Sequence, residues 1–244
     1  MDASHLAELI ELEETYWWHV SKRRLVMDWL RRHAAPPARL VEGGVGSARD
    51  LQEFVRAGYE ARGFDLMPES VAHACLRGLD VVGHDLEAPW PVDPGAFDVA
   101  VLLDVLEHMG RPVRVLENVR AALRPGGVAV ITVPAYPALH GDWDRALGHH
   151  RRYTRKMLRE HACDASLEVE HLVHWNSFSL PAALLVRGGQ RLFPRDSPPA
   201  EFPRVPRWLN ETLIGLADVE RAWLSSGPLP FGLSLFAVLR RPPS

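Results

Sequence analysis

A glycine-rich turn and an acid about 20 positions after it are the residues whose types and spacing say most about chemistry. Residues 40–48 read Leu-Val-Glu-Gly-Gly-Val-Gly-Ser-Ala, and Asp65 ends a second apolar stretch, 59–65. Glycines let a backbone come close to a ligand because no Cβ stands in the way. An acid at the tip of the next strand can accept hydrogen bonds from the two hydroxyls of a ribose. The pair therefore predicts a site for a ligand that contains a nucleoside.

The same turn separates two classes of nucleoside ligand. The dinucleotide pattern Gly-x-Gly-x-x-Gly starts at Gly44 but meets Arg49 at its last position. Glu42, inside the turn, would repel a pyrophosphate and would attract an ammonium group. The residues thus favour S-adenosylmethionine, whose amino-acid tail and sulfonium are cationic and which has no phosphate. An NAD(P)-dependent oxidoreductase is the less favoured reading.

Segments of two kinds alternate along the chain and would hold these residues in place. Apolar runs predict strands at 39–43, 59–65, 80–84, 97–103, 128–133, 167–174 and 234–239. Helical patterns cover 5–33, 48–56, 68–77, 112–123, 153–161 and 208–223, and Pro125-Gly126-Gly127 is expected to end the fourth of them. The alternation indicates an α/β fold, a largely parallel sheet covered by helices. The last strand is expected to join a sheet edge antiparallel, and the proline-rich stretch 194–206 to be a loop.

Composition bounds the class of protein. The chain has 244 residues, 47% of them hydrophobic, which suits one α/β domain with a modest appendage. A net charge of −3 gives no sign of a nucleic-acid partner. Cys75 and Cys163 match no metal spacing and are interpreted as reduced, buried thiols, and no metal site is expected. No signal peptide or membrane-spanning run is apparent, so a cytoplasmic protein is expected. The sequence does not indicate an oligomeric state.

Further stretches, in order along the chain, carry a resemblance to a known family. Gly83-His84-Asp85-Leu86 ends the third predicted strand, the apolar run 97–103 leads into Asp104-Val105-Leu106-Glu107-His108, and 123–131 reads Leu-Arg-Pro-Gly-Gly-Val-Ala-Val-Ile. With the glycine turn, these segments resemble the class I S-adenosylmethionine (SAM)-dependent methyltransferases. Residues 13–19, 133–140 and 144–154 are similar to a broad bacterial subgroup of that family, many of whose members act on small molecules.

The resemblance implies a fold and a reaction, and the residue patterns of the chain predict its domain organisation. The fold would be a Rossmann-like, seven-stranded, mostly parallel sheet with helices on both faces and a reversed last strand. Residues 1–244 would form a single domain, with an N-terminal helical lid (about 1–35) and an insertion of proline-rich loop plus helix (about 176–228). The aromatic run 16–18 would be core packing or part of that lid. The reaction would move a methyl group from SAM to an oxygen or nitrogen of a small-molecule acceptor and leave S-adenosylhomocysteine.

The resemblance also implies cofactor-binding roles at individual positions. One group forms the loop, one binds ribose and adenine, and one lies under the methionine part: Glu42, Gly44 and Gly46; Asp65, Leu66, Asp85 and the backbone of Leu86; Asp104 and Val105. The sequence departs from the family pattern at Ala48, where glycine is common.

Three residues are candidates for catalysis. His108 follows the strand 97–103, at the edge where open α/β sheets bind ligands, and an imidazole suits a general base. In the basic segment 148–156, Arg151 or Arg152 could grip an acidic acceptor and His149 or His150 could take a proton. Of these, His149 and Arg152 are the favoured candidates. Asp104 and Glu107 could equally be the N-cap and the first-turn acid of a helix, and such a role is compatible with one in the site. Capping or solvent-exposed roles for these side chains, and a SAM-binding regulatory protein without catalysis, remain as alternatives.

Overall fold

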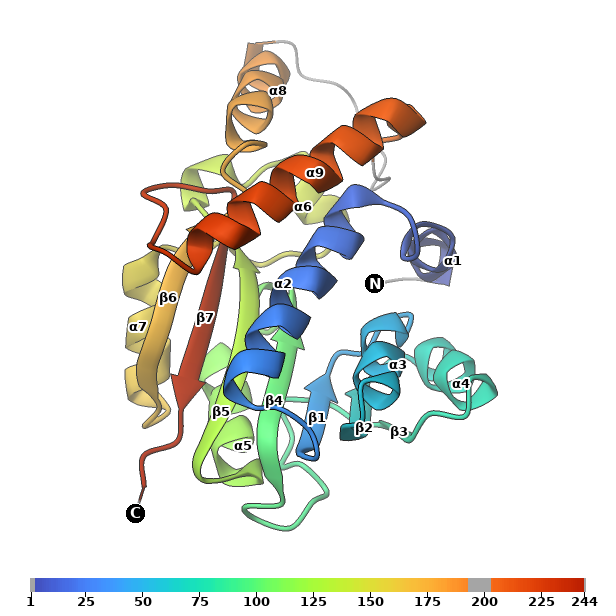
Figure 1. The fold of residues 1–244 in the computed structure, drawn as a ribbon, viewed down its shortest axis with the longest axis vertical. Coiled ribbons are helices and arrows are strands. Elements are labelled where there is room, and N and C mark those ends of the chain that lie inside the picture. The colour runs from blue at the N-terminus through green and yellow to red at the C-terminus, as the bar shows by residue number, and fades with distance from the viewer. Residues whose placement is uncertain (1–2, 193–202, 244) are drawn as a thin grey trace.

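The strands of the described chain form one seven-stranded sheet, as the sequence predicts (Figure 1). The structure is a computed structural model that describes residues 3–192 and 203–243. The sheet order is β3-β2-β1-β4-β5-β7-β6. Its strands are β1 (Arg39–Gly43), β2 (Glu60–Asp65), β3 (Val81–Gly83), β4 (Phe97–Leu103), β5 (Leu123–Pro134), β6 (Glu168–Trp175) and β7 (Ser234–Arg240).

The direction of the strands brings five carboxyl ends to one edge. Strands β3, β2, β1, β4 and β5 are parallel neighbours, whereas β7 is antiparallel to both β5 and β6. The reversed last strand is therefore confirmed. Its expected place at a sheet edge is wrong, because β7 inserts between β5 and β6 and leaves β6 as the edge strand. A strand with buried side chains on both faces gains more from an interior position than from an exposed edge.

Alternate side chains of the central strands enter two separate cores. In β4, Val99, Val101 and Leu103 pack on one face and Ala100 and Leu102 on the other, all buried. This period of two is the ordinary geometry of a strand covered on both sides. The first face carries α2 (Trp17–His33), α3 (Arg49–Arg56) and α4 (Pro68–Leu76), and the second carries α5 (Pro112–Ala122) and α7 (Arg155–Asp164).

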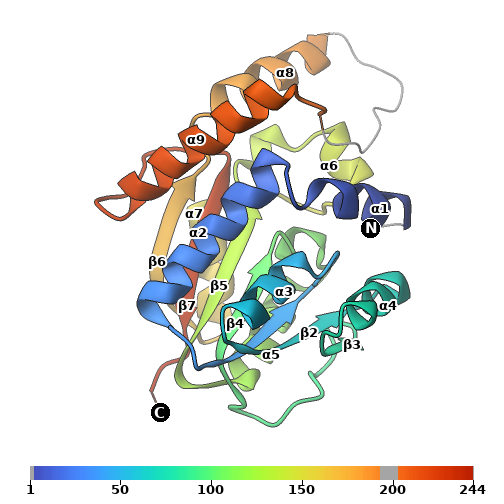
Figure 2. The ribbon, with the colours of Figure 1, turned by 45° about the vertical axis from the view of Figure 1, so that its right-hand side comes forward.

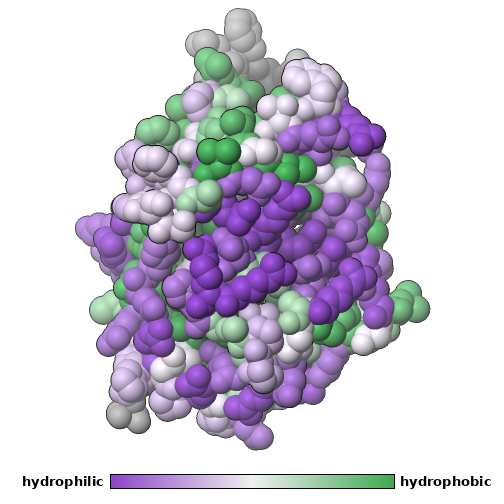
Figure 3. All heavy atoms as spheres, in the orientation of Figure 1, coloured by the Kyte–Doolittle hydropathy of each residue, from purple (hydrophilic) through white to green (hydrophobic). Residues whose placement is uncertain are grey.

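Further helices lie beyond the carboxyl ends of the parallel strands (Figure 2). They are α1 (Ala3–Leu12), α6 (Asp142–Ala146), α8 (Leu180–Leu192) and α9 (Arg207–Leu224). Asn210 of α9 ties the two ends of the chain together: its Oδ1 accepts a hydrogen bond from the Trp17 amide (2.8 Å), and its Nδ2 donates to the Thr15 carbonyl (2.8 Å). In Figure 3, charged and polar residues cover the region of α2, and apolar ones gather above it, near α8 and α9.

Several local expectations need correction. The predicted helix 5–33 is two helices, and the chain between them is held by ion pairs of Glu13 and Glu14 with arginines of the domain. Pro125-Gly126-Gly127 lies inside β5, which begins at once after α5. Cys75 and Cys163 are free, as expected, but exposed, since they face outward on α4 and α7. Much of the predicted loop 194–206 lies outside the described residues. No helix among the described residues is long and apolar enough to cross a membrane.

Candidate active site

A cavity of about 660 Å³ opens at the carboxyl edge of the parallel strands. The loop after β1 and the end of β4 form its floor, and α2, the segment 139–152 and α8 form its walls. A cavity of this size lies in the range of small-molecule sites. The sheet topology thus brings the loops that the sequence singled out to one place.

The glycine turn leaves no room for side chains. Gly44 has φ +76°, and a Cβ on it would lie 2.7 Å from Cγ2 of Val105. The amide of Gly46 donates to Oδ2 of Asp65 (2.9 Å), and the Met67 amide donates to Oδ1 (2.8 Å). Asp65 is thereby fixed at the end of β2, next to the turn. Burial raises the pKa of its carboxyl, which these amides partly offset.

Glu42 is a buried acid that faces the cavity with an unsatisfied oxygen. Its side chain is 2% exposed and lines the cavity, and its Oε2 has no hydrogen-bond partner among the described residues. Burial, and then the negative charge of Asp50, raise its pKa well above the ordinary value. An ammonium group beside Glu42 would supply the missing partner and favour the charged form. The residues present therefore fit the amino-acid tail of SAM.

The raised pKa of Glu42 leads to a prediction about pH. Binding of a ligand with an ammonium tail needs Glu42 ionised, so the affinity for S-adenosylhomocysteine should rise as the pH is raised from 5.5 to 7.5. A rise of up to tenfold per unit is the limit for one coupled proton. Titration calorimetry checks this, with Glu42→Gln as the non-titrating control. A profile in Glu42→Gln as steep as that of the wild type would assign the titration to another group.

The predicted adenine end lies farther along the same sheet edge. Asp65 ends β2 opposite Gly83 of β3, and Asp85 follows with its side chain exposed. Leu66 is 70% exposed, whereas Leu86 is buried. These four residues adjoin the cavity along the edge but are not among its lining residues. The exposed side chains of Leu66 and Asp85 suit a flat ring that lies on the surface of the domain.

Asp104, the acid after β4, is joined to α2 by an ion pair. Lys22 donates to Oδ2 of Asp104 (2.9 Å), and the Thr132 hydroxyl donates to Oδ1 (3.0 Å). Burial opposes the charged state of both groups, but their mutual attraction lowers the pKa of Asp104 and raises that of Lys22. The pair fixes an N-terminal helix to the floor of the cavity.

Helix α1 and the segment that joins it to α2 cover the glycine turn. Glu14 accepts from Arg49 (2.7 Å), and Glu13 accepts from Arg77 (2.7 Å). Leu9 reaches to within 3.2 Å of the place where a Gly46 Cβ would be. Arg49, which breaks the dinucleotide pattern, thus holds the N-terminal segment over the turn.

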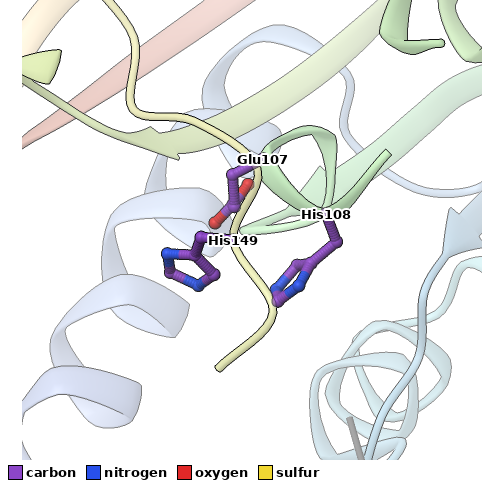
Figure 4. A group of neighbouring side chains, drawn as sticks. All are labelled: Glu107, His108 and His149. Carbon is purple, nitrogen blue, oxygen red and sulfur yellow. The ribbon is translucent and has the colours of Figure 1, made fainter. Parts of the chain in front are cut away.

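Two of the three catalytic candidates meet at the far wall of the cavity. The rings of His108 and His149 lie 4.6 Å apart, edge to face, beside the carboxyl group of Glu107 (Figure 4). Burial, and then the charge of His149, lower the pKa of His108 to about 4, so its imidazole is neutral near pH 7. Burial likewise raises the pKa of Glu107 well above its usual range.

The third candidate, Arg152, is engaged by a buried acid of the same wall. Oδ1 of Asp144 accepts from Nε of Arg152 (2.7 Å) and lies 3.1 Å from Nδ1 of His149, and Oδ2 accepts from the Gly141 amide (2.9 Å). Burial alone would raise the pKa of Asp144, but the bond with His149 and the charge of Arg152 hold it well below its ordinary value. Arg152 therefore orients Asp144 and, through it, His149.

Three residues of the site escaped the sequence analysis: Lys22, Glu107 as a site residue, and Asp144. Asp144 begins the segment 144–154 that carries part of the resemblance, and its spacing of five and eight positions from His149 and Arg152 is the signal that could have identified it. Lys22 carries no such signal, since a lysine on a helix is ordinarily exposed.

Comparisons with known proteins agree with this geometry. Residues 17–180 match the model of a family described as a methyltransferase domain. The ubiquinone biosynthesis O-methyltransferase of Ralstonia nicotianae is 30% identical over 141 residues, which are 52% of this chain and 59% of that protein. That of Burkholderia thailandensis is 29% identical over 108 residues, or 41% and 47%. The chain thus spans about half the length of these curated relatives.

Solved structures show the same fold at low identity. The complex between the Haloferax volcanii Trm112 methyltransferase activator and a putative methyltransferase contains a similar chain, with a TM-score of 0.65, 22% identity, and coverage of 98% of this chain and 95% of that one. The phosphoethanolamine N-methyltransferase 2 of Haemonchus contortus, in complex with S-adenosyl-L-methionine, gives 0.65 and 14%, with coverage of 99% and 57%.

Proposed function

Since the chain belongs to the methyltransferase domain family and is a class I SAM-dependent methyltransferase, we propose that it methylates an oxygen or nitrogen of a small-molecule acceptor. The observation that carries this proposal is the cavity of about 660 Å³, which runs from Glu42 and Asp104 to the wall of Glu107, His108 and His149. The printed name of the curated relatives, ubiquinone biosynthesis O-methyltransferase, supports a hydroxyl oxygen as the first choice. Within the same proposal, the small-molecule acceptor is an acidic metabolite in the narrower case.

Residues at the two ends of the cavity align the methyl donor with the acceptor. SAM supplies a methyl group on a sulfonium, and the neutral thioether that forms when the carbon–sulfur bond breaks is a good leaving group. Glu42 and Asp65 hold the donor side, and holding the acceptor in line with the methyl group lowers the barrier by about 7–11 kcal/mol. His149, oriented by Asp144, is the proposed acceptor of the hydroxyl proton, with His108 beside it. Proton transfer of this kind contributes about 10²–10⁴-fold.

We also propose that the N-terminal helices and the α8–α9 insertion act as a lid. Tyr16, Trp17 and Trp18 line the cavity, and the Tyr16 hydroxyl donates to the Pro203 carbonyl of the insertion (3.1 Å). Apolar walls exclude water, which favours a reaction that disperses the charge of the sulfonium. Both ends of the chain would then take part in covering the reacting groups.

The test of this function is a comparison of two adjacent histidines. His149→Ala should lower the turnover of methyl transfer by about 10²–10⁴-fold and change the affinity for S-adenosylhomocysteine by less than tenfold. His150→Ala, at an exposed residue outside the cavity lining, is the matched control. Transfer from labelled SAM to a panel of hydroxylated metabolites gives turnover, and calorimetry gives affinity. An equal loss of both in His149→Ala, with a lower melting temperature, would mean a structural role for His149.

A further inference from the structure

We propose that Glu107, His108 and His149 form a site for a divalent transition-metal ion, with Zn²⁺ as the representative, at the acceptor end of the cavity. Each residue offers one ligand atom, and these atoms all lie within 4.8 Å of one another (Figure 4). The role of the ion rests on the proposed function, because that function places the acceptor against this wall. The site itself rests on geometry alone.

The three ligands come from two loops that the fold fixes separately. Glu107 and His108 lie in the short 3-10 helix Leu106–His108 after β4, and His149 follows α6. The two loops are joined where the His150 amide donates to the Glu107 carbonyl (2.8 Å). Ligand atoms at about 2.0–2.2 Å from Zn²⁺ in a tetrahedron lie about 3.5 Å from one another. Side-chain rotations of His108 and His149, which border the open cavity, can close the remaining distance.

Glu107 supplies the independent reason to expect a cation. It is 0% exposed, and neither of its carboxylate oxygens has a hydrogen-bond partner on another described residue. Leaving a buried carboxyl group without a partner is costly, and such groups in native proteins require an explanation. A metal ion between Glu107 and the two imidazoles would satisfy it.

His149 already has the outer contact that metal-binding histidines use. Its Nδ1 faces Oδ1 of Asp144 at 3.1 Å, so Nε2 is the atom left for a metal. Asp144 is itself fixed by Arg152 and by the Gly141 amide. A carboxylate that accepts a hydrogen bond from the second ring nitrogen sets the tautomer and orientation of a histidine ligand and raises its basicity.

The ligand set selects the kind of metal and its task. Two imidazoles and one carboxylate suit Zn²⁺ and its neighbours, whereas Mg²⁺ and Ca²⁺ prefer oxygen ligands alone. Three protein ligands leave a position open, as in catalytic zinc sites, and all three residues line the cavity. With the ion bound, His149 serves as a ligand, so an acceptor hydroxyl bound to the ion would release its proton to water and not to His149, the acceptor proposed without a metal. Its oxygen then forms a bond to the methyl carbon while the carbon–sulfur bond breaks and leaves its electron pair on sulfur.

Metal stoichiometry tests the site without relying on catalysis. Tag-free full-length protein is treated with a chelator, dialysed and titrated with ZnCl₂ by calorimetry, and with Co²⁺ to record the visible absorption of a bound ion. We expect one ion per chain, a loss of affinity of at least 100-fold in His108→Ala and in His149→Ala, and no change in His150→Ala. Glu107→Gln should also bind Zn²⁺ more weakly than the wild type. Circular dichroism verifies that each variant is folded.

Two results would overturn the metal site. One is the absence of stoichiometric binding by the folded wild type, and the other is unchanged binding in the double variant His108→Ala/His149→Ala. The proposed function is judged separately, by S-adenosylhomocysteine binding and methyl transfer in the chelator-treated protein. Full activity without metal would leave the proposed function standing and remove the metal from it. Stoichiometric metal binding without methylation of any small molecule would leave the metal site standing and contradict the proposed function.

Discussion

Asp144→Ala is expected to lower the free energy of unfolding by about 3–5 kcal/mol, because it leaves a buried arginine without its counter-charge. The side chain of Asp144 is 0% exposed and that of Arg152 is 6% exposed. The variant also removes the acceptors of His149 and of the Gly141 amide. Turnover should therefore fall together with stability. Denaturant unfolding followed by fluorescence measures the first effect, and labelled methyl transfer measures the second.

A neighbour in the same helix provides the control for this prediction. Asp142 pairs with Arg145, but both side chains are largely exposed. Exposed pairs contribute about 0–1 kcal/mol, so Asp142→Ala should leave both stability and turnover close to wild type. A loss in Asp144→Ala no larger than that in Asp142→Ala would show that Arg152 finds another partner and that Asp144 does not organise the wall.

Gly44→Ala is expected to weaken S-adenosylhomocysteine binding by at least tenfold and to cost more stability than backbone strain alone explains. A residue with a side chain at φ +76° costs about 1–2 kcal/mol. The added Cβ would also lie 2.7 Å from the buried Val105, and overpacking of this kind costs about a further 1–3 kcal/mol. The turn must shift to relieve that contact, and with it the backbone that faces the ligand.

Gly78→Ala separates the strain from the contact. Gly78 has nearly the same φ, +73°, but a Cβ there would meet nothing within 4 Å. It should lose about 1–2 kcal/mol of stability and none of the affinity. Unfolding in denaturant and calorimetry with S-adenosylhomocysteine give both quantities for both variants. Equal stability losses and equal affinities in the two variants would mean that Val105 yields without disturbing the turn.

Local patterns were enough to predict the frame that carries the donor side of the site. β4 has the bounds that its apolar run predicts, and the glycine turn and Asp65 come together because parallel strands end at one edge. Ala48, the one departure from the family's glycine pattern, has a structural consequence. It has φ +59°, a conformation that glycine adopts at less cost, so the position where the family pattern has glycine carries a strained alanine.

The acceptor side depended on contacts that no local pattern encodes. Lys22 is buried, and its partner Asp104 lies 82 positions later in the sequence. The local sequence around Glu107 indicates only an acid at the start of a helix. Its burial depends on two loops that meet in space, which no local pattern shows. The prediction that Cys75 and Cys163 are buried was wrong for a related reason. Cysteine is buried on average, but the exposure of a cysteine on a helix depends on which side of that helix faces the sheet.

The position of β7 between β5 and β6 sets the order in which the molecule can be completed on the ribosome. Strands β1 to β5 are made first and can pair with one another as they emerge. β6 has no neighbour until β7 arrives, and residues 176–233 must be translated in between. At about 5–20 residues per second that delay lasts several seconds. The donor half of the enzyme can therefore take shape during synthesis, whereas a nascent chain stopped before residue 234 would hold β6 unpaired and exposed to other chains.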